Sequence, residues 1–168
     1  MAEMFSKWSD VEKYLLKVIN SAMDDVADDS KKLLEKHVST DVYDVGTDMG
    51  RLYYYDDTKK PTGQLKSSIT SSKDAISNNS VTVSIHHDFD KMEYDVDTFL
   101  HGSNYWSILD VRRLLPYFID QGKTGGFFGA KWKGLARPYI SNTRNELKNG
   151  VAKKYMINAL KEKVNVLE

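Results

Sequence analysis

Apolar residues near the N-terminus follow the period of an α-helix. They recur every three or four positions, at Val11, Leu15, Val18, Ala22, Val26 and Leu33. This spacing places them on one face of a helix, and most charged residues of the segment fall on the other face. Ser9 and Glu12 also have the order of a capping box, with Ser9 as the N-cap. We therefore predict a helix from about Ser9 to His37 that buries one face in the monomer core; its length also suits a subunit interface.

Two further helices are predicted in the second half of the chain. The first covers Ser107 to Asp120, where Pro116 kinks the helix or ends it early. The last opens at Arg137-Pro138, because proline suits the first turn of a helix. Its apolar positions form two stripes: Ile140, Thr143, Leu147 and Val151, then Met156, Ala159, Leu160, Val164 and Leu167. Between the stripes, Asn149-Gly150 is either a C-cap with a break or a glycine tolerated inside one long helix.

Strand patterns occupy the middle of the chain. The stretch from Asp41 to Tyr55 is rich in valine and tyrosine, which favours a strand with tyrosines on both of its faces. Residues Ser67 to Asp88 predict a β-hairpin with its turn at 77–80. The second strand of this hairpin alternates between apolar and polar residues over Val81-Thr82-Val83-Ser84-Ile85. We expect its two valines and its isoleucine to face the core.

A short segment before the hairpin predicts a corner between a helix and a strand. It reads Pro61-Thr62-Gly63-Gln64-Leu65-Lys66-Ser67-Ser68-Ile69-Thr70. Pro61 fits the first turn of a helix, and Gly63 lets another backbone pass close by. Leu65 and Ile69 lie four positions apart, so both face inward from one side of the helix. Together these elements predict an α+β fold, with a small, mainly antiparallel sheet flanked by a long N-terminal helix and a C-terminal helix.

The composition narrows the class of protein. The 168 residues predict a single domain over 1–168, with a C-terminal helical extension at 151–168. Lys and Arg together number 24, as do Asp and Glu, so no net charge draws the chain to nucleic acid or to an anionic membrane. The absence of cysteine excludes disulfides and thiolate metal sites, and it suits assembly in the cytoplasm. We expect neither a signal peptide nor a membrane span, since the N-terminus lacks the pattern and the apolar runs are short.

A glycine-rich loop is predicted over Gln121 to Gly134. Its basic and aromatic residues are candidates for an interface or a channel lumen: Lys123, Phe127, Phe128, Lys131, Trp132 and Lys133. Gly122-Lys123-Thr124 copies the end of a phosphate-binding P-loop, but Tyr117 stands where that motif needs a glycine, so nucleotide binding is not expected. We expect the loop to become ordered against a partner or to line a channel through which DNA passes.

Two short motifs carry a resemblance to a known family. Residues 61–69 resemble the TGxLxxSI signature of neck and tail-completion proteins of long-tailed bacteriophages, and Ala136-Arg137-Pro138-Tyr139-Ile140 is similar to the RPF-type segment of the same family. The order of the predicted helices and strands agrees with that family as well. By this resemblance, the positions that define the fold are Pro61, Thr62, Gly63, Leu65, Ile69, Arg137, Pro138 and Tyr139.

The resemblance implies a structural virion protein rather than an enzyme, with no cofactor. Proteins of this kind complete the neck or tail end and join head to tail, typically as rings around the DNA channel and often as hexamers. The implied partners are further copies of the chain and the neighbouring neck, head-completion and tail-tube proteins, with non-specific contact to DNA in the channel and no membrane. The implied location is the neck or tail of the virion, assembled in the cytoplasm of the host.

Two other functions remain open from the sequence. One is a nucleic-acid-binding module that uses the tyrosines at 53–55 and the lysines of the glycine-rich loop, against which the zero net charge argues. The other is a metal-dependent hydrolase that uses His86, His87, Asp88 or His101. Because adjacent residues on a strand point to opposite faces, we expect that His86 and His87 cannot both bind one ion without a bulge.

Overall fold

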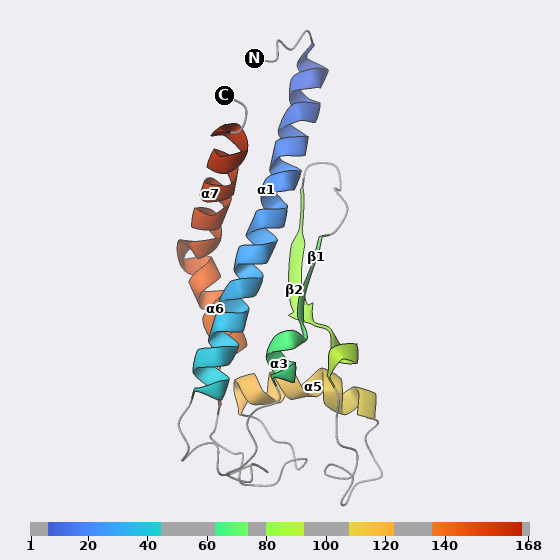
Figure 1. Cartoon of the computed structure of the whole chain (residues 1–168), viewed down its shortest axis with the longest axis vertical. Helices are drawn as coiled ribbons and strands as arrows, with labels where there is room; N and C mark the ends of the chain where they lie inside the picture. Colours follow the sequence, from blue (N-terminus) through green and yellow to red (C-terminus); the bar gives the residue numbers. More distant parts are fainter. Residues whose placement is uncertain (1–6, 45–62, 74–79, 93–107, 123–135, 166–168) are drawn as a thin grey trace, which may run out of the picture. The chain divides into compact units, whose positions relative to one another are not determined.

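The computed structural model describes residues 7–44, 63–73, 80–92, 108–122 and 136–165, and it has the predicted α+β fold (Figure 1). A long N-terminal helix, a two-stranded antiparallel sheet and a helical C-terminal region make up these parts of the chain. The chain divides into two compact units. Unit 1 comprises Met1–Leu33, Ser71–Ile85 and Arg144–Glu168, and unit 2 comprises Leu34–Thr70 and His86–Thr143.

Helix α1 covers Trp8–His37, which confirms the long helix predicted from the apolar period. It begins slightly earlier than predicted, because the backbone N–H of Val11 already donates to the carbonyl of Lys7 at 3.4 Å. Ser9 therefore lies inside the first turn, and its prediction as the N-cap is wrong.

The chain remains helical beyond His37, in a π-helical segment over Val38–Tyr43. The prediction of a strand from Asp41 is therefore wrong for Val42 and Tyr43. Val38 and Val42 are both buried, and their spacing of four lets them share one helical face. Burial of this face outweighs the strand preference of the individual residues. The remainder of that predicted strand, including the tyrosines at 53–55, lies outside the described residues.

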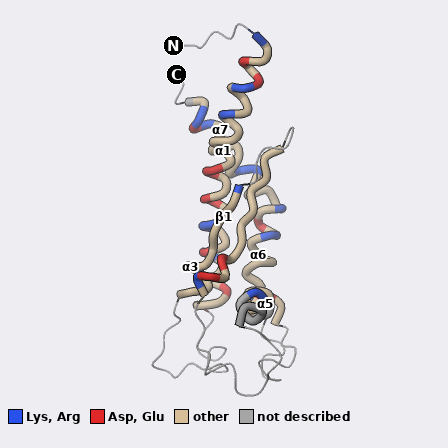
Figure 2. The backbone as a smooth tube through the Cα atoms, turned by 90° about the vertical axis from the view of Figure 1, so that its right-hand side faces the viewer, with Lys and Arg blue, Asp and Glu red and all other residues tan. Residues whose placement is uncertain are grey.

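Unit 1 pairs the N-terminal part of α1 with helix α7, Ala152–Asn165. Lys163 Nζ of α7 lies 2.8 Å from Asp25 Oδ2 of α1, and Figure 1 shows the two helices side by side. Alanines at 22, 27 and 159 are buried in this unit, and small side chains of this kind let neighbouring backbones approach closely. Acidic and basic residues both occur along α1 and α7 (Figure 2).

The helix-to-strand corner is confirmed. Helix α3, Gln64–Ser67, leads directly into strand β1, Ile69–Lys73. Gly63 precedes the helix with φ of +79°, in the left-handed region that favours glycine. Ile69 is buried as expected, whereas Leu65 is only half-buried. Pro61 and Thr62 lie outside the described residues.

The second strand of the hairpin, β2, covers Val83–His87 rather than the predicted Val81 to Ile85. Val83, Ser84 and Ile85 are all half-buried, so the predicted division between core-facing and outward residues does not hold here. The division is clear at the end of the strand, where His86 is exposed and His87 is buried. This confirms the expectation that the two histidines point to opposite faces.

Helix α5 covers Ile108–Gln121 and contains Pro116 in its interior, so the proline does not end the helix early. Gly122 follows with φ of +59°, and a Cβ placed there would lie 2.5 Å from the backbone nitrogen of Ala136. This close approach requires glycine and holds the end of α5 against the segment that opens the next helix. Residues 123–135, with every candidate residue of the glycine-rich loop, lie outside the described part of the chain.

The C-terminal region consists of helix α6, Tyr139–Glu146, a π-helical segment over Leu147–Val151, and α7. Asn149 and Gly150 depart from helical backbone angles, with φ of +109° at the glycine. Of the two alternatives for this dipeptide, the structure therefore has the break. The apolar residue Leu167 at the end of the predicted stripe lies outside the described residues.

Candidate functional site

A buried hydrogen-bond chain in unit 2 joins the two motifs that carry the family resemblance. Tyr139, the first residue of α6, is completely buried, and its Oη lies 3.0 Å from Nε2 of His87. The other ring nitrogen of His87 lies 2.8 Å from Oγ of Ser68, at the corner between α3 and β1. The hydroxyl of Ser68 in turn donates to the carbonyl of Leu65 at 2.9 Å. His87 thereby links the corner motif to the motif that opens α6.

The burial of His87 determines its protonation state. Burial, aided by the nearby charge of His86, lowers the pKa of His87 from 6.5 to about 4, so the imidazole is neutral at pH 7. A neutral imidazole has one donor and one acceptor. One ring nitrogen of His87 therefore donates and the other accepts, with Oγ of Ser68 as the partner of Nδ1 and Oη of Tyr139 as the partner of Nε2. Both ring nitrogens of His87 therefore have a hydrogen-bond partner.

The contact between Ser68 and His87 has the distance of a nucleophile and its base, but its surroundings differ from those of a catalytic pair. Ser68 is completely buried, and its proton is donated to a backbone carbonyl. The rings of His87 and Tyr139 also pack edge to face, with centroids 5.9 Å apart. The arrangement is suited to holding a strand end, a helix start and a tight corner in one geometry.

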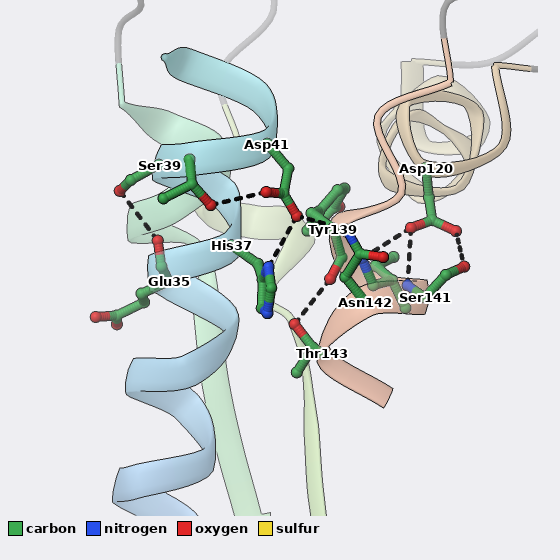
Figure 3. Close-up of polar contacts among 11 residues, drawn as sticks. Glu35, His37, Ser39, Asp41, Asp120, Tyr139, Ser141, Asn142 and Thr143 are labelled. Atoms are coloured by element: carbon green, nitrogen blue, oxygen red, sulfur yellow. Dashed lines mark hydrogen bonds and ion pairs between the residues drawn. The ribbon is translucent and has the colours of Figure 1, made fainter. Parts of the chain in front are cut away.

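A second group of contacts fixes the start of α6. The Asp120 carboxylate, near the end of α5, accepts hydrogen bonds from the backbone nitrogens of Ile140 at 2.7 Å and of Ser141 at 3.0 Å (Figure 3). It also accepts from the Ser141 hydroxyl at 2.8 Å. These backbone groups have no partner within their own helix, so Asp120 acts as an N-cap from a different element. Its negative charge also lies at the positive end of the helix dipole.

A third group of contacts connects α6 to the end of α1. The Asp41 carboxylate lies 2.8 Å from Nδ1 of His37 and accepts from Asn142 at 2.9 Å (Figure 3). Burial by itself would raise the pKa of Asp41, but hydrogen bonds from Asn142, Thr40 and His37 outweigh it and hold that pKa below its ordinary value. Arg137 adds a hydrogen bond from Nη1 to the carbonyl of Val42 at 3.2 Å.

Of the residues named from the sequence, the structure brings together the corner and the Arg137-Pro138-Tyr139 segment, with Tyr139 at the centre. The linking residues His87, Asp120 and Asp41 were not predicted in these roles. Ser68 does lie inside the corner motif, and His87 was considered only as a metal ligand or hydrolase residue. The available signal for a structural role was the spacing of two that places His87 on the same strand face as Val83 and Ile85.

Two features expected of other functional classes are not seen in the part of the chain that the structure describes. Within it, no group of three or more histidine or acidic side chains is placed to hold a metal ion. Among its helices, none has the length and the apolar character needed to cross a membrane.

Comparison with known proteins identifies a family. The model of the YomN family matches residues 7–166, which is nearly the whole chain. Neither the curated proteins nor the solved structures contain a match to the chain.

Proposed function

The chain belongs to the YomN family, a phage-derived family, and from this premise we propose that it is a structural virion protein. In this proposal it completes the neck or tail end of a long-tailed bacteriophage and joins the head to the tail. It acts as a ring of copies around the DNA channel, with a hexamer as the expected form. Its partners are the neighbouring neck, head-completion and tail-tube proteins.

Large apolar side chains exposed on two helices carry the proposal. Of the described residues, the exposed large apolar ones in unit 1 are Trp8, Leu15, Leu16, Ile157 and Val164. All of them belong to α1 or α7. Scattered single apolar residues are normal on a protein surface, but a concentration on two paired helices is typical of a surface that other subunits cover. A protein that works by assembly needs such a surface.

The motif residues support an architectural role. Tyr139 and Ser68 are completely buried and connected through His87, so they act on the fold rather than on a ligand. A hydrolase that used His86 and His87 together would need both on one side of the strand, yet one is exposed and the other buried. We therefore propose that the protein has no catalytic centre. We propose that the glycine-rich loop, with Lys123, Lys131 and Lys133, faces the lumen or an adjoining ring. In the lumen its lysines contact DNA without sequence preference.

Deleting the gene from a phage or prophage that encodes this chain tests the proposal. Electron microscopy of the induced lysate should show DNA-filled heads and finished tails that are not joined. Supplying the wild-type gene in trans should restore joined particles, which controls for effects on neighbouring genes. Joined, infectious particles at the wild-type frequency in the deletion strain would overturn the proposal.

A further inference from the structure

The exposed apolar residues of α1 continue a face that is buried further along the same helix. Trp8, Leu15 and Ala22 follow one another at intervals of seven, so they lie on nearly the same side of α1. Trp8 is 81% exposed and Leu15 is 50% exposed, whereas Ala22 is 0% exposed. The face that is covered at Ala22 thus has two exposed apolar side chains on the preceding turns, Trp8 and Leu15.

Two side chains of unit 1 contact α1 further along the helix. Lys163, near the end of α7, pairs with Asp25. Lys73, at the end of β1, lies 2.6 Å from Asp24 Oδ1 and 3.3 Å from the carbonyl of Asn20. The turns from Trp8 to Leu15 precede all of these contacts, and Figure 1 shows this end of α1 extending past the end of α7.

Helix α7 has a second exposed apolar stripe with the same spacing. Ile157 is 42% exposed and Val164 is 53% exposed, and seven positions separate them. Lys161 is exposed and lies between them, four positions after the first and three before the second. Glu12 is exposed and has the same relation to Trp8 and Leu15 on α1. The two stripes thus have matching spacing and opposite central charges.

We propose that the α7 stripe of one copy of this chain packs on the α1 stripe of the next copy, as the contact between neighbours in the assembly. In this contact Ile157 and Val164 cover Trp8 and Leu15, and Lys161 pairs with Glu12. The inference deepens the proposed function and rests on it, since it names the partner and the surface by which the ring is built.

The charges select this pairing over its alternatives. Two α1 stripes would bring two Glu12 carboxylates together, and two α7 stripes would bring two Lys161 ammonium groups together, which like-charge repulsion disfavours. The exposed lysines of α1 in this segment, Lys13 and Lys17, lie on the opposite side of the helix from Leu15 and do not neutralise Glu12 across the stripe. Pairing of α1 with α7 joins unlike surfaces, so two copies joined in this way still have one unused α1 stripe and one unused α7 stripe. Contacts of this kind between unlike surfaces generate a ring when the rotation from one copy to the next closes.

Two double variants, each lacking one stripe, test the pairing. In the α1 variant Trp8→Gln is combined with Leu15→Gln, and in the α7 variant Ile157→Gln is combined with Val164→Gln. Glutamine is a good helix former and carries no charge, and all four positions are exposed, so circular dichroism should show that both variants stay folded. The control, Lys13→Gln with Lys17→Gln, changes the opposite side of α1.

Sedimentation analysis over a range of concentrations up to about millimolar distinguishes the outcomes. We expect the wild type and the control to form higher oligomers and each double variant to remain a monomer of 19.2 kDa. A 1:1 mixture of the two variants should form a complex of twice that mass and nothing larger, because it contains one intact pair of stripes. Oligomers formed by either variant alone, or a wild type that is monomeric at every concentration, would overturn the pairing.

Exchange of the central charges provides a second readout. Glu12→Lys should abolish the wild-type oligomer, and adding Lys161→Glu to the same chain should restore it. Wild-type assembly by the single Glu12→Lys variant, or no restoration by the double exchange, would also overturn the pairing. Neither result affects the gene-deletion experiment, so failure of this contact and failure of the head-to-tail role are distinguished.

Discussion

Replacing Tyr139 by phenylalanine tests whether the buried hydrogen-bond chain holds the two motifs together. The substitution keeps the ring, which is completely buried, and removes only the hydroxyl that lies 3.0 Å from Nε2 of His87. Because His87 is buried, its Nε2 is left without this hydrogen-bond partner. We expect the folded state to lose stability without losing its fold.

The magnitude follows from the two consequences of removing the hydroxyl. A buried hydrogen bond contributes about 0.5–1.5 kcal/mol net, and a buried acceptor left without a partner costs about 1–3 kcal/mol. These quantities overlap and do not add, and the retained ring leaves no large cavity. The free energy of unfolding should therefore fall by about 1–3 kcal/mol. For a chain of 168 residues this corresponds to a decrease in Tm of roughly 2–12 °C.

Urea unfolding followed by circular dichroism measures this difference, with Tyr155→Phe as the matched control. Tyr155 is half-buried on α7, outside the hydrogen-bond chain of Ser68, His87 and Tyr139. The control should stay within about 0.5 kcal/mol of the wild type. Tyr139→Phe and Ser68→Ala should also be non-additive by about 0.5 kcal/mol or more, since both residues bond to His87. A Tyr139→Phe protein as stable as the wild type would refute the structural role of the hydrogen-bond chain through His87.

Three further predictions concern the pH, a cap and two glycines. The pKa of His87 is about 4 in the folded chain, so between pH 6.5 and 4 the unfolded chain binds a proton that the folded chain does not. Lowering the pH from 6.5 to 4 should therefore decrease the free energy of unfolding by on the order of 3 kcal/mol. Urea titrations at several pH values should show that His87→Gln reduces this dependence. Asp120→Ala should lower the free energy of unfolding by about 1–2 kcal/mol, because it removes the cap of α6. Gly150→Ala should cost about 1–2 kcal/mol for its backbone angle, and thermal melts should show a larger cost for Gly122→Ala, whose Cβ would also clash with Ala136.

Local patterns in the sequence were sufficient for several elements. The three-to-four period from Val11 to Leu33 predicted α1, and the segment from Pro61 to Thr70 predicted the corner that α3 and β1 form. Arg137-Pro138 correctly marked the start of α6. Periodicity and helix starts depend on residues a few positions apart, so a single sequence contains the information that determines them.

Patterns at this scale were misleading where tertiary contacts compete with local preference. Val42 and Tyr43 have strand preferences, but burial of Val38 and Val42 on one face keeps them helical. Pro116 predicted a possible early end of α5, yet the helix continues to Gln121. In both cases the energy of packing a helical face exceeds the cost of a residue that is locally unfavourable.

The site that joins the motifs was decided by the tertiary structure alone. Ser68 and His87 are 19 positions apart, and His87 and Tyr139 are 52 positions apart. Asp120 caps a helix that begins 19 positions later in the chain, at Tyr139. No local rule specifies which distant donor meets which acceptor, since that depends on how the strand, the corner and the helices pack. Local sequence patterns predicted the long helix and the two motifs, and the packing of unit 2 determined that His87 connects these motifs, because a buried polar group must find its partner wherever the fold places one.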